Sequence, residues 1–212
     1  MVITVCNQKG GSGKSTIAVN LAACFAAAKR TLLIDADPQQ TALEWQADRP
    51  AHLPHVQVIG LPVHNLHKAV PAFTRDYEVI VLDAGGRIGA NVRAACVVGD
   101  FLVVPMRPAK ADILSTKDFL ANIVEGIQAL RALSYGILIN QMQTGTVIGR
   151  AAQEEVERWG YPLFEAVIHS RIAYQEAMAT GMSVVEHDAR SKAAEEIRAF
   201  FDELQGEVER EE

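Results

Sequence analysis

A glycine-rich loop near the amino terminus, residues 9–16 with the sequence KGGSGKST, constrains the fold more than any other feature of the chain. It follows a short apolar segment, residues 2–7, and it opens an alanine-rich stretch with helical periodicity, residues 14–28. Glycines let successive backbone N–H groups turn toward one anion, and the helix that follows adds its positive amino-terminal end. A strand, this loop and a helix in succession predict a phosphate-binding loop, or P-loop.

The residues of this loop are expected to surround a nucleotide. Lys14 is predicted to bind the β and γ phosphates of ATP, and the Ser15 hydroxyl is predicted to bind the Mg²⁺ ion that bridges them. The expected ATP-binding residues of the loop are Lys9, Gly10, Gly11, Ser12, Gly13, Lys14, Ser15 and Thr16. The alternative, a glycine turn with a surface lysine, does not account for the strand before the loop or the helix after it.

Short apolar segments rich in Val and Ile alternate with longer helical patterns along the chain, as in βα units. The predicted strands are residues 2–7, 31–36, 56–59, 78–83, 101–105, 135–140 and 163–168. The predicted helices are residues 14–28, 63–73, 90–97, 113–132, 148–159, 172–179 and 189–205. We therefore expect an α/β fold, a single P-loop NTPase domain over residues 1–212. Its mostly parallel, twisted sheet should have about seven or eight strands, with helices on both faces.

Three aspartates lie at the ends of apolar segments. The carboxyl ends of parallel strands meet at one edge of a sheet, and that edge also holds the loop. Asp35 and Asp37 lie two residues apart in the segment LLIDADPQ, so an extended backbone directs both side chains to the same side. Asp83 ends the segment VIVLD, an apolar strand plus Asp that is typical of a Walker B element. Asp83 is therefore predicted to hold a water molecule bound to Mg²⁺.

The loop departs from the common pattern G-x-x-x-x-G-K-S/T, because Gln8 stands in the place of a glycine and Lys9 follows it. The run KGGSGKST resembles the deviant Walker A motif of the ParA/MinD family of ATPases. In that family a second, signature lysine near the start of the loop contacts nucleotide across a dimer. The resemblance implies this role for Lys9, which would bring positive charge to the phosphoryl-transfer site as an arginine finger does.

The same resemblance implies roles for the acidic segments. Asp37 would orient or deprotonate the attacking water, and Asp35 would help to organise Mg²⁺ and Lys14 through water. The switch I residues would be Asp37, Pro38 and Gln39, and the switch II residues would be Asp83, Ala84, Gly85 and Gly86. Family members often have Asp-Thr-Pro or Asp-Gly-Ala at switch II, so the sequence DAG is a departure from the family.

Two further segments resemble the adenine pocket of small ParA proteins. Residues 103–112, VVPMRPAKAD, are similar to a P-x-x-P-x-x-x-D segment that lines this pocket and the dimer face, which implies nucleotide contacts for Pro105 and Pro108. Asn140 ends an apolar strand, where the family has an asparagine that reads the base; an ordinary turn residue is the alternative. The resemblance extends over essentially the whole chain and is nearest to the short, ParF-like plasmid partition ATPases.

Composition excludes several other classes. The chain has 212 residues and is 49% hydrophobic, enough for one compact core, and no apolar run reaches the roughly 18 residues of a membrane span. The three cysteines are too scattered for a zinc or iron–sulphur site. The carboxyl-terminal end is acidic and lacks the basic amphipathic helix of a MinD-like protein. We expect a cytoplasmic protein with no membrane partner and no helix-turn-helix domain before the loop.

The expected function is that of a slow ATPase that closes as a homodimer around ATP and Mg²⁺ and releases ADP. By resemblance, it would bind nonspecific DNA on the nucleoid in the ATP state. It would then position plasmid or chromosomal DNA, or another large cargo, with a ParB/ParG-like centromere-binding protein or a cargo adaptor. Because the formal charge is -6, DNA contact needs a local patch of cations. The candidate DNA contacts are Arg150, Arg158, Arg171, Lys192 and Arg198.

Two alternatives remain open at this point. One is a metabolic ATP-dependent ligase of the same superfamily, which would bind a small substrate beside the γ phosphate. The other keeps the ATPase mechanism and changes the cargo to a carboxysome or a chemoreceptor cluster. ATP-dependent retention on DNA of random sequence distinguishes the first alternative from a partition ATPase.

Overall fold

The computed structural model of the protein describes residues 1–63, 65–85, 90–145 and 147–210. Within these residues, seven strands form one sheet in the order β3-β2-β4-β1-β5-β6-β7, and every neighbouring pair is parallel. The strands are β1 (Val2–Val5), β2 (Thr31–Asp35), β3 (Gln57–Gly60), β4 (Val79–Asp83), β5 (Phe101–Met106), β6 (Ser134–Met142) and β7 (Leu163–His169). The predicted α/β class, the parallel sheet and all seven predicted strands are confirmed.

Burial explains why these strands have nearly continuous apolar sequences. Every residue of β1, β2, β4 and β5 is buried, because helices cover both faces of the sheet. The edge strands β3 and β7 are partly exposed. Because β1 is the central strand, the loop that follows it lies in the middle of the carboxyl edge of the sheet, between the ends of β4 and β5.

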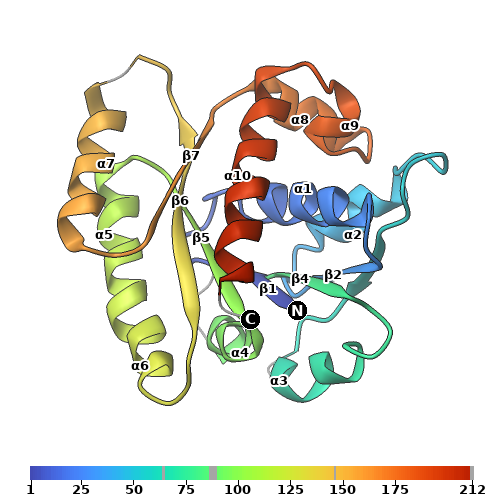
Figure 1. Ribbon diagram of the computed structural model, residues 1–212, viewed down its shortest axis with the longest axis horizontal. Helices are drawn as coiled ribbons and strands as arrows, with labels where there is room; N and C mark the ends of the chain where they lie inside the picture. Colours follow the sequence, from blue (N-terminus) through green and yellow to red (C-terminus); the bar gives the residue numbers. More distant parts are fainter. Residues whose placement is uncertain (64, 86–89, 146, 211–212) are drawn as a thin grey trace.

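The helices form two layers. They are α1 (Lys14–Ala26), α2 (Thr41–Ala47), α3 (Leu66–Ala69), α4 (Ala90–Val98), α5 (Lys110–Phe119), α6 (Glu125–Gln128), α7 (Val147–Trp159), α8 (Ile172–Ala179), α9 (Val184–His187) and α10 (Lys192–Glu209). One hydrophobic cluster joins the sheet to α1, α2 and α8–α10, for example through Phe25 and Phe200. The other joins it to α3–α5 and α7, for example through Phe119 and Val156. Figure 1 shows α5 and α7 on one side of β6 and α10 on the other.

The helix predictions differ from the structure in four places. The helix predicted over residues 113–132 is α5, a π-helical turn (Leu120–Val124) and α6 in succession. In the range 63–73, which was predicted to be one helix, the described residues form α3 and a 3₁₀ turn (Val70–Ala72). The helices α2 and α9 were not predicted, because each is too short, at seven and four residues, to give a periodic apolar pattern.

Gly136 offers a test of how β6 packs against the sheet's outer strand and α10. A Cβ atom built on Gly136 lies 2.5 Å from Cε2 of Phe164, whose ring is buried and stacks edge-on against Phe200. We expect Gly136→Ala to lower the free energy of unfolding by about 1–3 kcal/mol, because the ring cannot retreat without displacing its neighbours. Urea denaturation monitored by circular dichroism measures this.

Gly126→Ala is the matched control. A Cβ atom at Gly126 in α6 meets nothing within 4 Å, so alanine should stabilise the helix by up to about 1 kcal/mol. A Gly136→Ala variant that unfolds at the wild-type urea concentration would contradict this packing.

Candidate nucleotide-binding site

Four polar features gather at the carboxyl edge of the sheet. The P-loop connects β1 to α1, and the strand register pairs Val5 of β1 with Asp83 of β4, and Asp83 with Asp35 of β2. Asn140 approaches from β6 on the other side of the loop, where its side-chain amide meets Ser12. The predicted convergence of the loop and both strand-ending aspartates at one edge is therefore present in the structure.

Side chains anchor the start of the P-loop to α5. The Gln8 amide donates hydrogen bonds to the Ser115 carbonyl at 2.7 Å and to the Ser115 hydroxyl at 3.1 Å. Asn7 is buried; its amide donates to the Pro105 carbonyl at 2.9 Å, and its side-chain oxygen accepts from the Lys9 N–H at 3.1 Å. Gln8 has no positive φ, so this backbone position does not require glycine. Gln8, which stands in the place of the usual glycine, therefore attaches the start of the P-loop to α5.

The end of β6 holds the middle of the loop. The Asn140 amide donates to the Ser12 carbonyl at 2.7 Å, and the Gln141 amide donates to the Gly11 carbonyl at 3.1 Å. Gly13 has a φ of 86°, and a Cβ atom there would lie 2.3 Å from the Asn140 amide nitrogen. Gln141 itself has a φ of 57°, a left-handed conformation that is strained for a residue with a side chain.

These contacts reveal a functional residue that the sequence interpretation missed. Gln141 gives no signal in a single sequence, since it is one polar residue after a strand. Asn140 is 3% exposed and is bonded to the loop by its nitrogen and to the Gln141 N–H by its oxygen. The structure therefore gives Asn140 a role in shaping the loop, and recognition of the adenine base by Asn140 stays a prediction.

Lys14 lies inside the loop and is only 6% exposed. Its ammonium donates to the Lys9 carbonyl at 3.1 Å, so the lysine reaches back across the loop. Burial lowers the pKa of Lys14, and the carboxylates of Asp83 and Asp37 oppose that change. The three groups predicted to act on phosphate, metal and water thus influence one another's charge. The side chain of Lys9 is partly exposed, and within the described residues its ammonium has no ion-pair partner.

Asp83 is a fully buried carboxylate whose oxygens have no hydrogen-bond partner among the described residues. Burial raises its pKa to about 7, while the neighbouring Ser15 hydroxyl and the Lys14 ammonium act in the opposite direction. A buried carboxylate without partners normally requires a cation or a water molecule. Asp83 and Ser15 therefore fit a Mg²⁺ ion with its bound water, whose remaining ligands would come from phosphate oxygens.

Asp35 connects β2 to α2. One oxygen accepts from the Asp37 N–H at 3.1 Å, and the other accepts from the N–H groups of Ala42 at 2.8 Å and Leu43 at 3.2 Å. Burial raises the pKa of Asp35, and these backbone hydrogen bonds oppose the rise. Asp35 thus caps the first turn of α2 from the end of the preceding strand. Its predicted part in organising Mg²⁺ stays a prediction.

The segments predicted to be switch I and switch II meet at Asp37. The Asp37 carboxylate accepts from the Gln39 N–H at 3.0 Å, which closes the turn around the exposed Pro38. A Cβ atom built on Gly85 would lie 3.3 Å from the Asp37 carboxyl carbon. Gly85 therefore leaves the space that the carboxylate occupies. The predicted switch residue Gly86 lies outside the described residues.

The end of β5 borders the loop. Pro105 is buried, and Pro108 is partly exposed. Between them, Arg107 forms a two-bond ion pair with the buried Asp112, at 2.8 and 3.2 Å. This pair holds the segment against the start of α5. Contact of either proline with adenine stays a prediction.

Two of the candidate DNA contacts form ion pairs within the protein. Arg158 lies 2.8 Å from Glu155 on the same helix, and Arg171 lies 2.5 Å from Glu196 of α10. The Arg171 hydrogen bond raises the pKa of this arginine, and His169 also bonds to Glu196. The favourable charge of both arginines toward DNA is therefore partly cancelled.

The remaining candidates are less constrained. Lys192 is exposed at the start of α10, and Arg198 donates to the Ala189 carbonyl at 2.8 Å. The side chain of Arg150 lies outside the described residues. DNA contact through these cations stays a prediction.

The buried Asp83 carboxylate predicts a pH-dependent effect on stability. Its pKa of about 7 in the folded protein exceeds the ordinary value of 3.8, so the folded state takes up a proton as the pH falls from 8 toward 4. The cost of burying the ionised form is therefore greatest above pH 7 and disappears near pH 4. In nucleotide-free and Mg²⁺-free protein, Asp83→Asn should raise the free energy of unfolding by about 2–4 kcal/mol at pH 8, and by much less at pH 4.5.

Urea denaturation of both proteins at the two pH values measures this difference. An equal effect of Asp83→Asn at pH 8 and pH 4.5 would show that the carboxylate carries no burial penalty.

The Gln141 amide predicts an effect on nucleotide affinity. Gln141→Ala removes the donor to the Gly11 carbonyl, so the loop should bind nucleotide roughly 2- to 10-fold more weakly, as expected for one hydrogen bond. Titration with a fluorescent ATP analogue measures the dissociation constant. Gln141→Gly is the control, because it removes the same amide but accepts the positive φ without strain. Wild-type affinity in both variants would remove this residue from the site.

Comparisons with known proteins agree with this geometry. The family described as "CobQ/CobB/MinD/ParA nucleotide binding domain" matches residues 3–184. "Maintenance of carboxysome distribution protein A" of Gloeobacter kilaueensis is 31% identical over 228 residues, covering 99% of this chain and 94% of the relative. "Sporulation initiation inhibitor protein Soj" of Bacillus subtilis is 25% identical over 238 residues, covering 92% of this chain and 94% of the relative.

The fold also has a counterpart among solved structures. The cell division ATPase MinD of Pyrococcus furiosus superposes with a TM-score of 0.78 at 17% identity, covering 97% of this chain and 98% of that one. The family match spans the P-loop, Asp37, Asp83 and the β6 residues Asn140 and Gln141. The chain belongs to the CobQ/CobB/MinD/ParA family of nucleotide-binding domains.

Proposed function

We propose that the protein is an ATPase that closes as a homodimer around ATP and Mg²⁺ and uses hydrolysis to position a large cargo. The observation that carries the proposal is the grouping of Lys14, Asp37 and Asp83 at one P-loop, where both carboxylates act on the charge of the lysine. A cation for phosphate, a carboxylate for water and a carboxylate for the metal are the parts that phosphoryl transfer requires.

Each residue would have a separate task in hydrolysis. Lys14 would bind phosphate oxygens, and Ser15 and Asp83 would hold the metal and its water. When bound, Mg²⁺ supplies positive charge against the charge that develops on the phosphate oxygens. Asp37 would orient the attacking water or accept its proton, and the space left by Gly85 beside that carboxylate supports this role.

The exposure of Lys9 supports the dimer. Its side chain is partly exposed, and the next residues, Gly10 and Gly11, are exposed. In a dimer that meets at this side of the loop, Lys9 would enter the partner's site as the signature lysine. The hydrogen bond from Lys14 to the Lys9 carbonyl fixes the backbone from which this side chain extends.

The cargo is proposed in two forms. Similarity to the chromosome-partitioning proteins Soj of Thermus thermophilus and ParA of Myxococcus xanthus supports movement of chromosomal or plasmid DNA, for which we propose a ParB/ParG-like centromere-binding partner. Similarity to a carboxysome distribution protein supports a protein body and a cargo adaptor as the second candidate. Nonspecific DNA would be the surface on which the protein moves in both cases, and the protein would then lie on the nucleoid in the cytoplasm. Among the described residues, no helix combines the length and the apolar character needed to span a bilayer.

Retention on DNA tests the proposal. We expect wild-type protein with ATP and Mg²⁺ to be retained on random-sequence DNA at low salt and released as salt rises. Asp37→Ala should hydrolyse ATP about 10²-fold more slowly, since the water loses its carboxylate, and should stay on DNA longer. Lys14→Ala should show neither retention nor hydrolysis. Retention is measured by surface-coupled DNA and hydrolysis by phosphate release.

The outcomes separate the parts of the proposal. Absence of wild-type retention at low salt, with hydrolysis intact, would contradict the DNA role and favour a metabolic ligase. Wild-type turnover in Asp37→Ala would refute the assignment of Asp37.

A further inference from the structure

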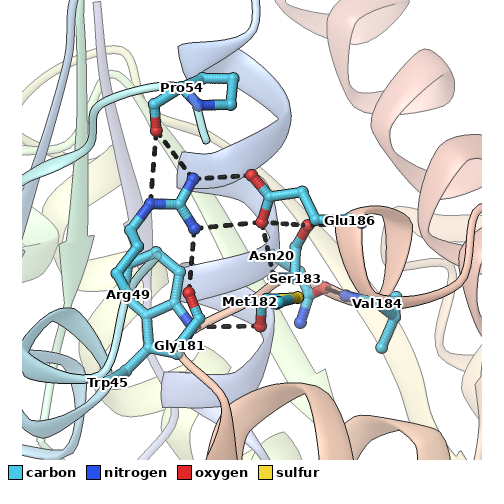
Figure 2. A network of polar contacts seen from close by, with 9 residues as sticks. All are labelled: Asn20, Trp45, Arg49, Pro54, Gly181, Met182, Ser183, Val184 and Glu186. Carbon is cyan, nitrogen blue, oxygen red and sulfur yellow. Dashed lines mark hydrogen bonds and ion pairs between the residues drawn. The ribbon is translucent and has the colours of Figure 1, made fainter. Parts of the chain in front are cut away.

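A buried polar network joins the helix after the P-loop to the helix after switch I. Figure 2 shows its members, which come from α1, from α2 and the turn that follows it, and from the segment that leads into α9. At its centre, Arg49 pairs with Glu186, which lies 137 positions later in the sequence. The Arg49 side chain is 6% exposed and the Glu186 side chain 13% exposed, so the pair is largely removed from water.

Every N–H group of the Arg49 guanidinium has an acceptor. Two donate to the Glu186 carboxylate at 2.6 and 3.1 Å, one donates to the Gly181 carbonyl at 3.0 Å, and two donate to the Pro54 carbonyl at 2.8 and 3.3 Å. The guanidinium also lies 4.7 Å from the centre of the Trp45 ring. Because the guanidinium is planar and rigid, its five N–H groups can reach all of these acceptors in only one orientation.

The backbone of Gly181 packs tightly against the backbone of residues 48–49 at the end of α2. Gly181 has a φ of 66°, and a Cβ atom there would lie 2.3 Å from the Arg49 backbone nitrogen and 2.4 Å from the Asp48 carbonyl carbon. The indole N–H of Trp45 donates to the Met182 carbonyl at 3.1 Å. The carboxyl end of α2 therefore rests directly on the backbone of residues 181–182.

The same segment is bonded to the helix of the P-loop. The Val184 N–H donates to the Asn20 side-chain oxygen at 2.9 Å, and the Asn20 amide donates to the carbonyl of Thr16, the last residue of the loop, at 2.8 Å. Glu186 and Ser183 close a capping box that fixes the local backbone. Residues 181–186 thus bridge α1 and α2.

The helix α2 is too short to be stable without contacts to the rest of the protein. It has seven residues, fewer than an isolated helix needs to be stable in water. Asp35 fixes its amino end beside switch I, and the Arg49 junction fixes its carboxyl end. The orientation of α2 depends on both attachments.

We infer that Arg49 is a positioning residue for ATP hydrolysis. Hydrolysis requires Asp37, at the amino-terminal side of α2, to hold a fixed place relative to the γ phosphate bound by the P-loop and α1. The contacts of Arg49 hold α2 at a fixed distance from α1, and so hold Asp37 at a fixed distance from the phosphate site. A displacement of about 1 Å at a reacting group costs roughly 10²-fold in rate. The inference rests on the proposed function only in requiring ATP hydrolysis with Asp37 acting on water.

Arg49→Lys tests the inference while keeping a positive charge opposite Glu186. Lysine cannot reproduce the planar fork, so the acceptors at Pro54 and Gly181 lose their donors. We expect kcat to fall about tenfold and the dissociation constant for a non-hydrolysable ATP analogue to stay within about twofold, because the P-loop itself is unchanged. Glu186→Gln, which keeps the shape of the side chain, should lower kcat less.

Arg131→Lys is the matched control. Arg131 is another partly buried arginine that donates to backbone carbonyls, those of Cys96 and Gly99 at the end of α4, and these contacts do not involve α2. It should lower the melting temperature and leave kcat at the wild-type value. All rates are measured at a temperature at which circular dichroism shows every variant to be folded.

The outcomes distinguish positioning from simple support of the fold. Unchanged kcat in Arg49→Lys with a lower melting temperature overturns the inference, and so does a parallel loss of nucleotide affinity and kcat. Wild-type protein that hydrolyses ATP without retention on DNA contradicts only the proposed DNA role. Wild-type protein that binds ATP and does not hydrolyse it contradicts both, and this is visible before any variant is compared.

Discussion

A loop that turns its N–H groups toward an anion must turn its carbonyl groups elsewhere, and those carbonyls then need donors. In this protein three side chains supply them. The donor and acceptor pairs are Lys14 with the Lys9 carbonyl, Gln141 with the Gly11 carbonyl, and Asn140 with the Ser12 carbonyl. Two of these donors lie at the end of β6, 128 and 130 residues from their acceptors. The loop therefore reaches its binding shape only when both halves of the sheet have assembled around β1.

The positions of the aspartates and helices around the loop also depend on contacts between separate elements of the fold. Asp35 holds α2 through backbone N–H groups, and Asp83 lies beside it in register on the next strand. The bridge at Arg49 and Asn20 then links α2 and α1 at the side away from the sheet edge. A nucleotide would thus contact elements whose relative positions are fixed by hydrogen bonds of long sequence separation, which suits catalysis by preorganised charge.

Local pattern was enough to predict the fold class, the seven strands and the positions of Lys14, Asp35 and Asp83, because strand, loop and helix signals lie within a few residues of one another. It failed for α2, because the first turn of this helix is capped by Asp35 at the end of β2, across a turn with Gln40 in a left-handed conformation, and not by the residue directly before the helix. It also failed where the determining contact is distant in sequence. Gln141 and Arg49 acquire their roles from partners more than 100 residues away. The capping box of α9 was readable as S-x-x-E, but four residues give no periodicity to support it.

The site contains buried ionisable groups that lower the stability of the fold. Asp83 is ionisable, fully buried and without a hydrogen-bond partner among the described residues, and Lys14 is nearly as buried. Ordinary selection for stability favours apolar groups or complete pairs at such positions, because an unpaired buried charge is expensive. A ligand that brings phosphate oxygens to Lys14, and a metal to Asp83, completes both groups at once. Nucleotide and metal would therefore add to the stability of the fold by giving these two buried groups their partners.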